Sequence, residues 1–331
     1  MLPIVALSCG KLEETPTPAP ASAVITFGAE IGRDNSRAVS LVGSETEMRT
    51  KPFCVFGDWK RDAGHSETVF KQVNVTYNEA YSGWNYSPTK HWENSGDYEF
   101  RAYWPASTPI ANTSNTSALA LEYNMLTQDE DLMVAYKSCQ TKESTVDLSF
   151  RHALSAVAVK FETTDDTREY WIKRVYFTGL YYTGTLLYNA TDNTLDLTNA
   201  WLHAKRSDVG VNGITTMHLR EWSSDTGQKI PRQSNDYQAD FNLFIPQSLQ
   251  VDEGVAKPSI SITVDVKLED ITTEITFSVE LPSTDDEGNP WVWQAGKKYV
   301  YVIGGPPADY SISVSITDWD KVNASVGDIE F

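Results

Sequence analysis

The sequence predicts an all-β protein with two tandem β-sandwich domains. In residues 259–267, the apolar Ile260, Ile262, Val264 and Val266 alternate with polar residues, which is typical of a strand with one buried face. No segment keeps the i, i+3, i+4, i+7 apolar spacing of a helix over three turns. A chain of 331 residues has room for two such domains. A single large barrel is the alternative.

Similar alternation marks other strands along the chain. It recurs in residues 157–161, in residues 274–281 and in residues 312–316. We count roughly fifteen such runs, separated by Gly, Asn, Asp and Pro turns. The acidic turns at residues 165–166 and 285–287 lack the spaced pattern of a calcium loop, so we interpret them as hairpin turns.

A polar segment at residues 138–145 is the best candidate for a domain boundary. It separates a loop-rich first part, with many Tyr, Trp, Ser and Asn at residues 78–118, from a second part with longer strand pairs. We therefore predict an N-terminal sandwich over residues 24–142 and a C-terminal sandwich over residues 143–331. No internal repeat of fixed period is visible.

The first residues resemble a bacterial lipoprotein signal. Residues 1–8 are apolar and end in a small residue before Cys9, which would become the lipidated N-terminus. No Lys or Arg precedes this short stretch, so we expect the true start codon upstream, with residues 1–8 a truncated signal peptide. Residues 9–23 are polar and rich in proline, as in an extended linker. The alternative is an N-terminal strand with a buried cysteine.

The two other cysteines, Cys54 and Cys139, lie in strand-like segments. An oxidising envelope would permit a disulfide bond between them. Two buried thiols are an equally good interpretation.

Charge and motifs exclude several function classes. The chain carries 27 Lys and Arg against 45 Asp and Glu, and this net charge of −18 disfavours nucleic acid as a partner. The five histidines show no metal-ligand spacing, and no nucleophile elbow or phosphate loop is present. We predict no catalytic residue, no metal and no cofactor, and therefore a protein that is not an enzyme. We interpret His152 as a packed, hydrogen-bonded histidine and not as a catalytic base.

Several short sequence segments resemble segments that occur in the same order in the fimbrillin-like family of Bacteroidales. The resemblance is scattered over the whole chain and rests on residues 25–27, 35–38, 53–57, 84–86, 91–92, 98–105, 131–135, 146–155 and 293–301, ending at Trp319. It implies two transthyretin-like β-sandwich domains and a cell-surface lipoprotein that serves as a structural or accessory subunit of fimbriae in adhesion. The partners implied are outer-membrane lipid and other pilin subunits.

The resemblance also implies a way of assembly. Shaft subunits of this family are cut after an arginine near the N-terminus and lose their first strand, which a neighbour's strand replaces. Arg33 and Arg37 are the candidate cleavage positions here. A solvated loop is the alternative role for both, and the position of this protein in a fibre stays open.

Aromatic residues at residues 77–104 support a second hypothesis. Tyr81, Trp84 and Trp92 are candidates for a platform that stacks on sugar rings. The chain would then be a surface glycan-binding lipoprotein of a polysaccharide-uptake system. Host or bacterial surface glycans or proteins are further candidate partners of such a surface protein. Alternatively, these rings fill the core of the first sandwich.

Overall fold

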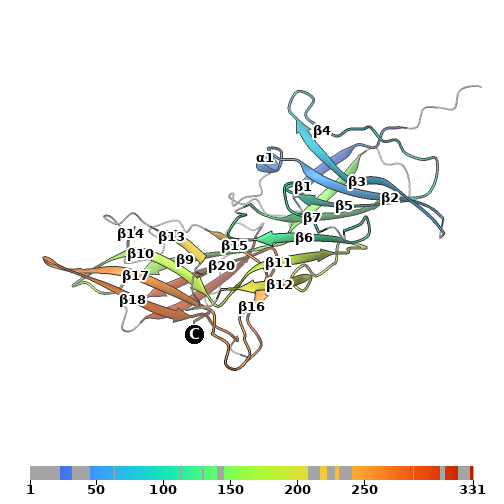
Figure 1. The fold of residues 1–331 in the computed structure, drawn as a ribbon. Helices are drawn as coiled ribbons and strands as arrows, with labels where there is room; N and C mark the ends of the chain where they lie inside the picture. Colours follow the sequence, from blue (N-terminus) through green and yellow to red (C-terminus); the bar gives the residue numbers. More distant parts are fainter. Residues whose placement is uncertain are drawn as a thin grey trace, which may run out of the picture.

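The computed structural model describes residues 23–31, 45–62, 64–111, 114–128, 130–139, 145–207, 217–221, 228–230, 241–285, 287–305, 310–319 and 329–330. Across these ranges the chain is built of strands, with one short helix, α1 (Glu45–Met48). The predicted all-β fold is therefore confirmed, and the layered sheets agree with β-sandwich domains (Figure 1). Among the described helices, none has the length and apolar character needed to cross a bilayer.

The first lobe is a seven-stranded sheet that curls round its own core. Its strand order is β1 (Phe27–Ile31), β8 (Val146–His152), β7 (Met133–Cys139), β5 (Asp97–Trp104), β2 (Phe53–Asp62), β3 (His65–Asn78) and β4 (Gly83–Asn85). The two end strands, β1 and β4, contact each other. The inner face carries a cluster rich in Phe, Trp and Tyr. At Gly57 a Cβ atom would approach the Phe100 ring to 2.8 Å, so only glycine lets that ring pack against β2.

The second lobe is a sandwich of two sheets. One has the order β15 (Asn242–Phe244), β9 (Ser155–Glu162), β20 (Lys297–Gly304), β21 (Ser311–Asp318) and β22 (Ile329–Glu330). The other has β13 (Met217–Glu221), β10 (Glu169–Thr178), β17 (Ser259–Leu268) and β18 (Ile271–Glu280), and β14 (Gln228–Lys229) also pairs with β10. A short pair, β16 (Gln247–Ser248) and β19 (Val292–Trp293), flanks them.

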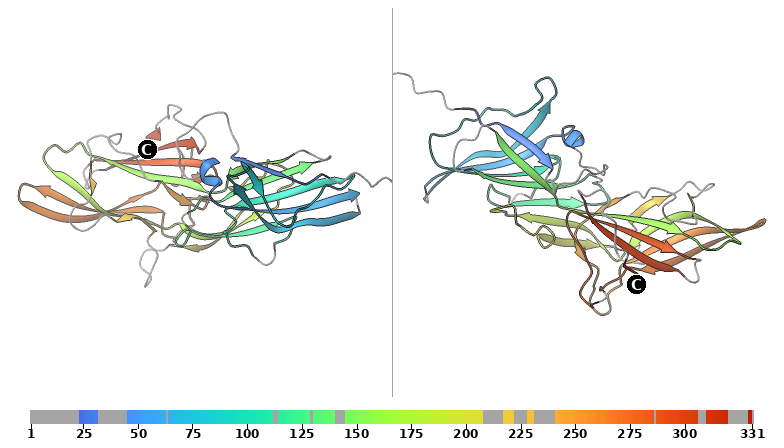
Figure 2. Two further views of the ribbon diagram at one scale, coloured as in Figure 1. Left: turned by 90° about the horizontal axis from the view of Figure 1, so that it is seen from above. Right: turned by 180° about the vertical axis from the view of Figure 1, so that it is seen from behind.

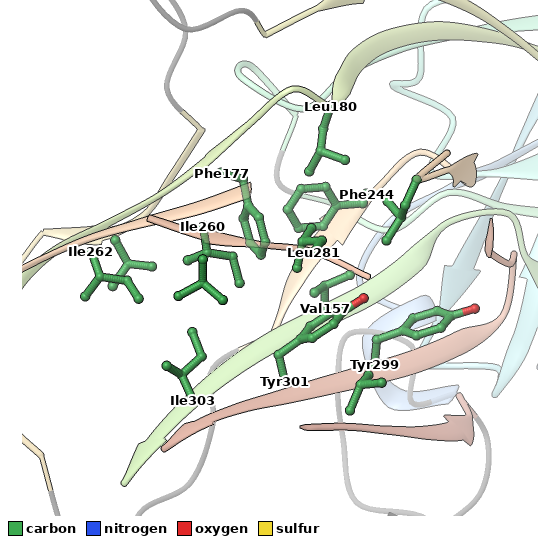
Figure 3. Packing of buried hydrophobic residues seen from close by; sticks show 14 of the residues in the cluster. Val157, Phe177, Leu180, Phe244, Ile260, Ile262, Leu281, Tyr299, Tyr301 and Ile303 are labelled. Carbon is green, nitrogen blue, oxygen red and sulfur yellow. The ribbon is translucent and has the colours of Figure 1, made fainter. Parts of the chain in front are cut away.

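The core of the second lobe consists of the alternating residues that the sequence pattern marks. Ile260 and Ile262 of β17 are fully buried and pack with Tyr301 and Ile303 of β20 (Figure 3). Val264 of the same strand is buried in the same cluster. The alternation of apolar and polar residues in the sequence therefore correctly predicted which side chains of this strand are buried.

A third sheet lies where the two lobes meet (Figure 2). It consists of β12 (Trp201–Arg206), β11 (Tyr181–Tyr188) and β6 (Leu119–Asn124). Its buried residues share a cluster with the outer face of the seven-stranded sheet. One strand of this sheet thus comes from the first lobe's part of the chain and two come from the second lobe's part.

The sheet pairing bears on the predicted boundary at residue 142. β8 begins just after that position, yet it pairs with β1 and β7 of the first lobe. The chain passes from one lobe to the other between β8 and β9, at Ala153 and Leu154. If the chain is divided according to which strands pair, the boundary therefore falls after β8. That the two parts are separate domains stays a prediction.

Candidate functional site

The strand β1 closes the curled sheet and is held mainly on one side by β8. The pairing is parallel over all five residues, from Phe27 opposite Val146 to Ile31 opposite Phe150. The amide of Val146 donates a hydrogen bond of 2.8 Å to the carbonyl oxygen of Thr26. Because β1 is the last strand of the order, its other edge has no full ladder among the described residues.

The residues just before β1 bridge to the other end of the sheet. Ile25 N donates to the carbonyl of Lys90, and Trp92 N donates to the carbonyl of Ala23, each at 2.9 Å. The Tyr86 hydroxyl donates to the carbonyl of Ile25 at 2.7 Å, and burial raises the pKa of this tyrosine. The segment 23–31 therefore occupies the seam where the curled sheet meets itself.

The side chains of this segment fill the core of the first lobe. Ile25 is fully buried and Phe27 nearly so. The Phe27 ring lies 5.3 Å from Phe70, 5.6 Å from Tyr86 and 5.7 Å from Phe100, in edge-to-face contacts. Removing β1 would thus open a groove lined by aromatic rings, with the backbone of β8 along one wall.

Three of the predicted functional residues lie outside the described residues. These are Cys9, the candidate lipidation site, and Arg33 and Arg37, the candidate cleavage positions. The two arginines follow β1 directly in the chain.

The three candidate ligand-facing aromatics have different environments. Tyr81 is 80% exposed on the turn between β3 and β4, whereas Trp92 is 1% exposed and belongs to the core of the first lobe. Trp84 is half-buried, with its ring 4.8 Å from Phe53 and 5.3 Å from Tyr77. Trp92 as a ligand-facing residue is therefore wrong, because its ring packs edge-on against Tyr98 at 4.6 Å. The structure does not gather the three rings into one platform.

The predicted pairing of Cys54 with Cys139 does not fit the sheet. Neither residue forms a disulfide bond, and both are buried. Strand β5 separates β2 from β7, so their backbones are about 10 Å apart, which exceeds the ~7 Å limit for a disulfide. Cys54 also faces the junction of the lobes, whereas Cys139 faces the core of the first lobe. The structure thus agrees with two buried thiols.

The histidine and the acidic turns have structural partners. His152 Nδ1 lies 2.5 Å from Asp131 Oδ2, and its ring stacks on Trp319 at 4.3 Å. The carboxylate of Asp285 accepts hydrogen bonds from the amides of Glu287 and Asn289, and the Asn289 side chain lowers the pKa of Asp285. In the described part of the chain, no group of three or more His, Cys, Asp or Glu is placed to hold a metal.

A cavity of about 550 Å³ lies between β8, the loop after β11 and the turn before β20. The charged groups in its wall have partners in the protein. Arg151 donates to two carbonyl oxygens of the loop, at residues 193 and 195, and Lys297 forms an ion pair with Asp318. Asp196 accepts from the amide of Thr198. We therefore interpret this cavity as part of the junction between the lobes.

Comparison with known proteins gives a family and a fold. Residues 37–319 match the family model described as fimbrillin-like, and no curated protein sequence matches the chain. A candidate cell adhesion protein from Bacteroides ovatus is 15% identical, with a TM-score of 0.51 over 92% of this chain and 100% of that chain. A similar protein from Bacteroides uniformis is 14% identical, with a TM-score of 0.49 over 89% and 99% of the two chains.

The tip fimbrial protein Mfa3 from Porphyromonas gingivalis, with a C-terminal truncation, is also similar. It is 11% identical, with a TM-score of 0.41 over 90% of this chain and 100% of that chain. At 15% identity the Bacteroides ovatus structure supports the fold alone, and the family assignment comes from the model match, which spans most of the sequence. That family is one of structural and adhesion proteins, in agreement with the expectation of a protein that is not an enzyme. The chain belongs to the fimbrillin-like family.

Proposed function

We propose that the protein is a subunit of fimbriae that acts in cell adhesion at the cell surface. Membership of the fimbrillin-like family supports this role. We further propose that Cys9 carries the lipid that anchors it in the outer membrane. Two acyl chains stabilise such an anchor, since each buried CH₂ contributes about 0.8 kcal/mol.

The assembly step that we propose is replacement of β1. Cleavage after Arg33 or Arg37 would separate residues 23–31 from the rest of the chain, and a strand of a neighbouring subunit would take their place beside β8. Main-chain hydrogen bonds would supply affinity, and the pockets of Ile25 and Phe27 would set the register. The single observation that carries this proposal is the position of β1, which is an end strand whose apolar side chains fill an aromatic core.

The test is the intact mass and N-terminal sequence of the protein taken from cells and from isolated fimbriae. We expect a form that begins at acylated Cys9 and, in fimbriae, a form that begins at Ala38 or Asp34. Arg37→Ala and Arg33→Ala separate the two positions, and Arg49→Ala, beyond β1, is the control. Assembled fimbriae whose subunits all retain residues 23–31 would contradict strand replacement.

A second candidate function is glycan binding, which the exposed Tyr81 favours. In its turn, Asn78 Oδ1 accepts a hydrogen bond of 2.9 Å from Ala80 N. A glycan array with the full chain, Tyr81→Ala and Tyr310→Ala tests it, since Tyr310 is an exposed tyrosine of the other lobe. Sugar binding that only Tyr81→Ala abolishes would favour this function.

A further inference from the structure

The strand β6 leaves the lobe to which its neighbours in the chain belong. The strands before and after it, β5 and β7, pair directly with each other from Tyr98 opposite Cys139 to Trp104 opposite Met133. Between them the chain crosses to the outer face of the sheet and pairs β6 antiparallel with β11. All six residues of β6 take part, with Leu121 opposite Leu186 and Leu119 opposite Tyr188.

Both edges of β6 are occupied. On the edge away from β11, Glu122 N donates to the carbonyl of Pro109, and Ala111 N donates to the carbonyl of Ala120, each at 2.9 Å. The incoming segment at residues 109–111 therefore covers that edge. The middle of β6 is therefore less accessible to a strand of another chain than a fully exposed edge would be.

The side chains of β6 belong to a core that both lobes share. Leu119, Leu121 and Tyr123 are buried in a cluster to which the first lobe contributes residues of β2, β5 and β7, and the second lobe residues of β9, β11 and β12. At Gly184 of β11, a Cβ atom would lie 3.0 Å from the carbonyl oxygen of Leu202 and 3.3 Å from the Trp201 ring, so the strands approach closely here.

Two arginines of the first lobe hold the loop that follows β11. Arg101, which is 2% exposed, donates from Nε to the carbonyl of Ala190 and from Nη1 to the carbonyl of Thr116, both at 2.8 Å. Arg151 donates to the carbonyls of Asn193 and Leu195 at 2.6 and 2.7 Å. In the reverse direction, Trp201 Nε1 of the second lobe donates to the carbonyl of Ala153 at 3.1 Å.

We propose that β6 is a strand that the first lobe donates to the second, so that the two lobes fold and unfold as one cooperative unit. Without β6, strand β11 would lose its partner on one edge, and the buried face of Leu186 and Tyr188 would lose the residues that cover it. Without β11 and the loop that follows it, the buried Arg101 would lose the carbonyl of Ala190 as an acceptor, and an unpaired donor on a buried charged group is costly. This proposal is independent of the fimbrial role, because it concerns contacts within one chain.

The test is hydrogen–deuterium exchange of the full chain during thermal unfolding, read separately for peptides of each lobe. The variants are Leu121→Ala in β6, Phe100→Ala in the core of the first lobe and Ile262→Ala in the core of the second, all three residues being fully buried. We expect each variant to lower one shared transition by roughly 3–7 °C, with peptides of β2 and β5 and peptides of β10 and β17 exchanging together. Leu121→Ala should also lower the protection of β11 and β12.

Independent lobes would give a different result. Ile262→Ala would then unfold β10 and β17 at a lower temperature while β2 and β5 exchanged at the wild-type temperature, and this would overturn the proposal. Unchanged protection of β11 and β12 in Leu121→Ala would likewise overturn the role of β6. If an alanine variant does not fold, Ile262→Val and Leu121→Val give the same comparison with a smaller shift.

Discussion

β1 and β6 both pair with a strand that is distant in sequence, but they are held differently. β1 pairs in parallel at the end of a sheet, with a ladder on one edge and a short bridge on the other. β6 is also an end strand with a short bridge on its other edge, but it pairs antiparallel with a strand of the other lobe, and its side chains are buried between the two lobes. The difference is that the side chains of β1 fill the core of one lobe, whereas those of β6 lie in a core that both lobes share. A strand that spans two lobes instead fixes their relation.

The largest expected effect comes from removing β1. A chain that begins at Ala38 loses three buried apolar side chains, Ile25, Phe27 and Ile31, worth about 2 kcal/mol each, so we expect its free energy of unfolding to fall by about 6 kcal/mol. A synthetic peptide of residues 23–31 added in trans should restore part of this loss, because it binds only the folded groove. Urea unfolding with and without the peptide measures both effects.

A scrambled peptide of the same composition is the control for this rescue. If the scrambled peptide stabilises the shortened chain as much as the native peptide does, the side-chain pockets of the groove do not set the register of the bound strand. An undiminished stability of the shortened chain would mean that β1 contributes nothing to the lobe.

The next largest expected effect distinguishes a buried from an exposed aromatic residue near the seam of the first lobe. Trp92→Ala should cost about 3–5 kcal/mol, since a buried ring leaves a cavity beside Tyr98. The same change at exposed Tyr81 should cost less than about 0.5 kcal/mol. Chemical denaturation of both variants decides this, and equal costs would contradict the burial difference between the two side chains.

At the junction, Arg101→Lys should destabilise the chain by about 2 kcal/mol. Lysine keeps the charge but cannot direct donors to Ala190 and Thr116 in the fixed fork of the guanidinium. Arg61→Lys, at an exposed position of the first lobe, is the matched control and should change little. If Arg101→Lys left the free energy of unfolding unchanged, the hydrogen bonds from Arg101 to these two carbonyls would contribute nothing to stability.

The sequence predicted those features that depend on local alternation. Ile260, Ile262 and Val264 are buried as their spacing of two requires, because neighbouring side chains on a strand face opposite ways. The sequence left the burial of Trp92 open, since this residue follows the bridge residue His91 and does not belong to a periodic strand. The family resemblance, not the periodicity, pointed to β1 and the arginines after it.

The partner of a strand is a harder problem than its existence. Leu119, Leu121 and Tyr123 alternate with polar or small residues and so indicate a strand, but nothing local specifies that β6 joins β11 rather than β5 or β7. Strand pairing depends on contacts between distant parts of the chain. For the same reason a composition change at residues 138–145 could not reveal that β8 pairs within the first lobe.

The last predicted effect is a dependence of stability on pH, which is about 1 kcal/mol for each pH unit and arises at the junction of the lobes. Burial raises the pKa of the Cys54 thiol from 9.0 to about 11, so its neutral form is favoured in the folded chain. Stability from this group is fully present below pH 9 and is lost as the pH rises through 9 toward 11, because only the unfolded chain readily ionises there. The expected slope is about 1 kcal/mol per pH unit, and Cys54→Ala should remove it from urea unfolding curves measured between pH 8 and 11.

Cys139→Ala, at the buried cysteine on the other face of the sheet, is the comparison. A slope that persists unchanged in Cys54→Ala would assign the alkaline loss to the buried tyrosines of the junction, Tyr103 and Tyr188, whose pKa values burial also raises.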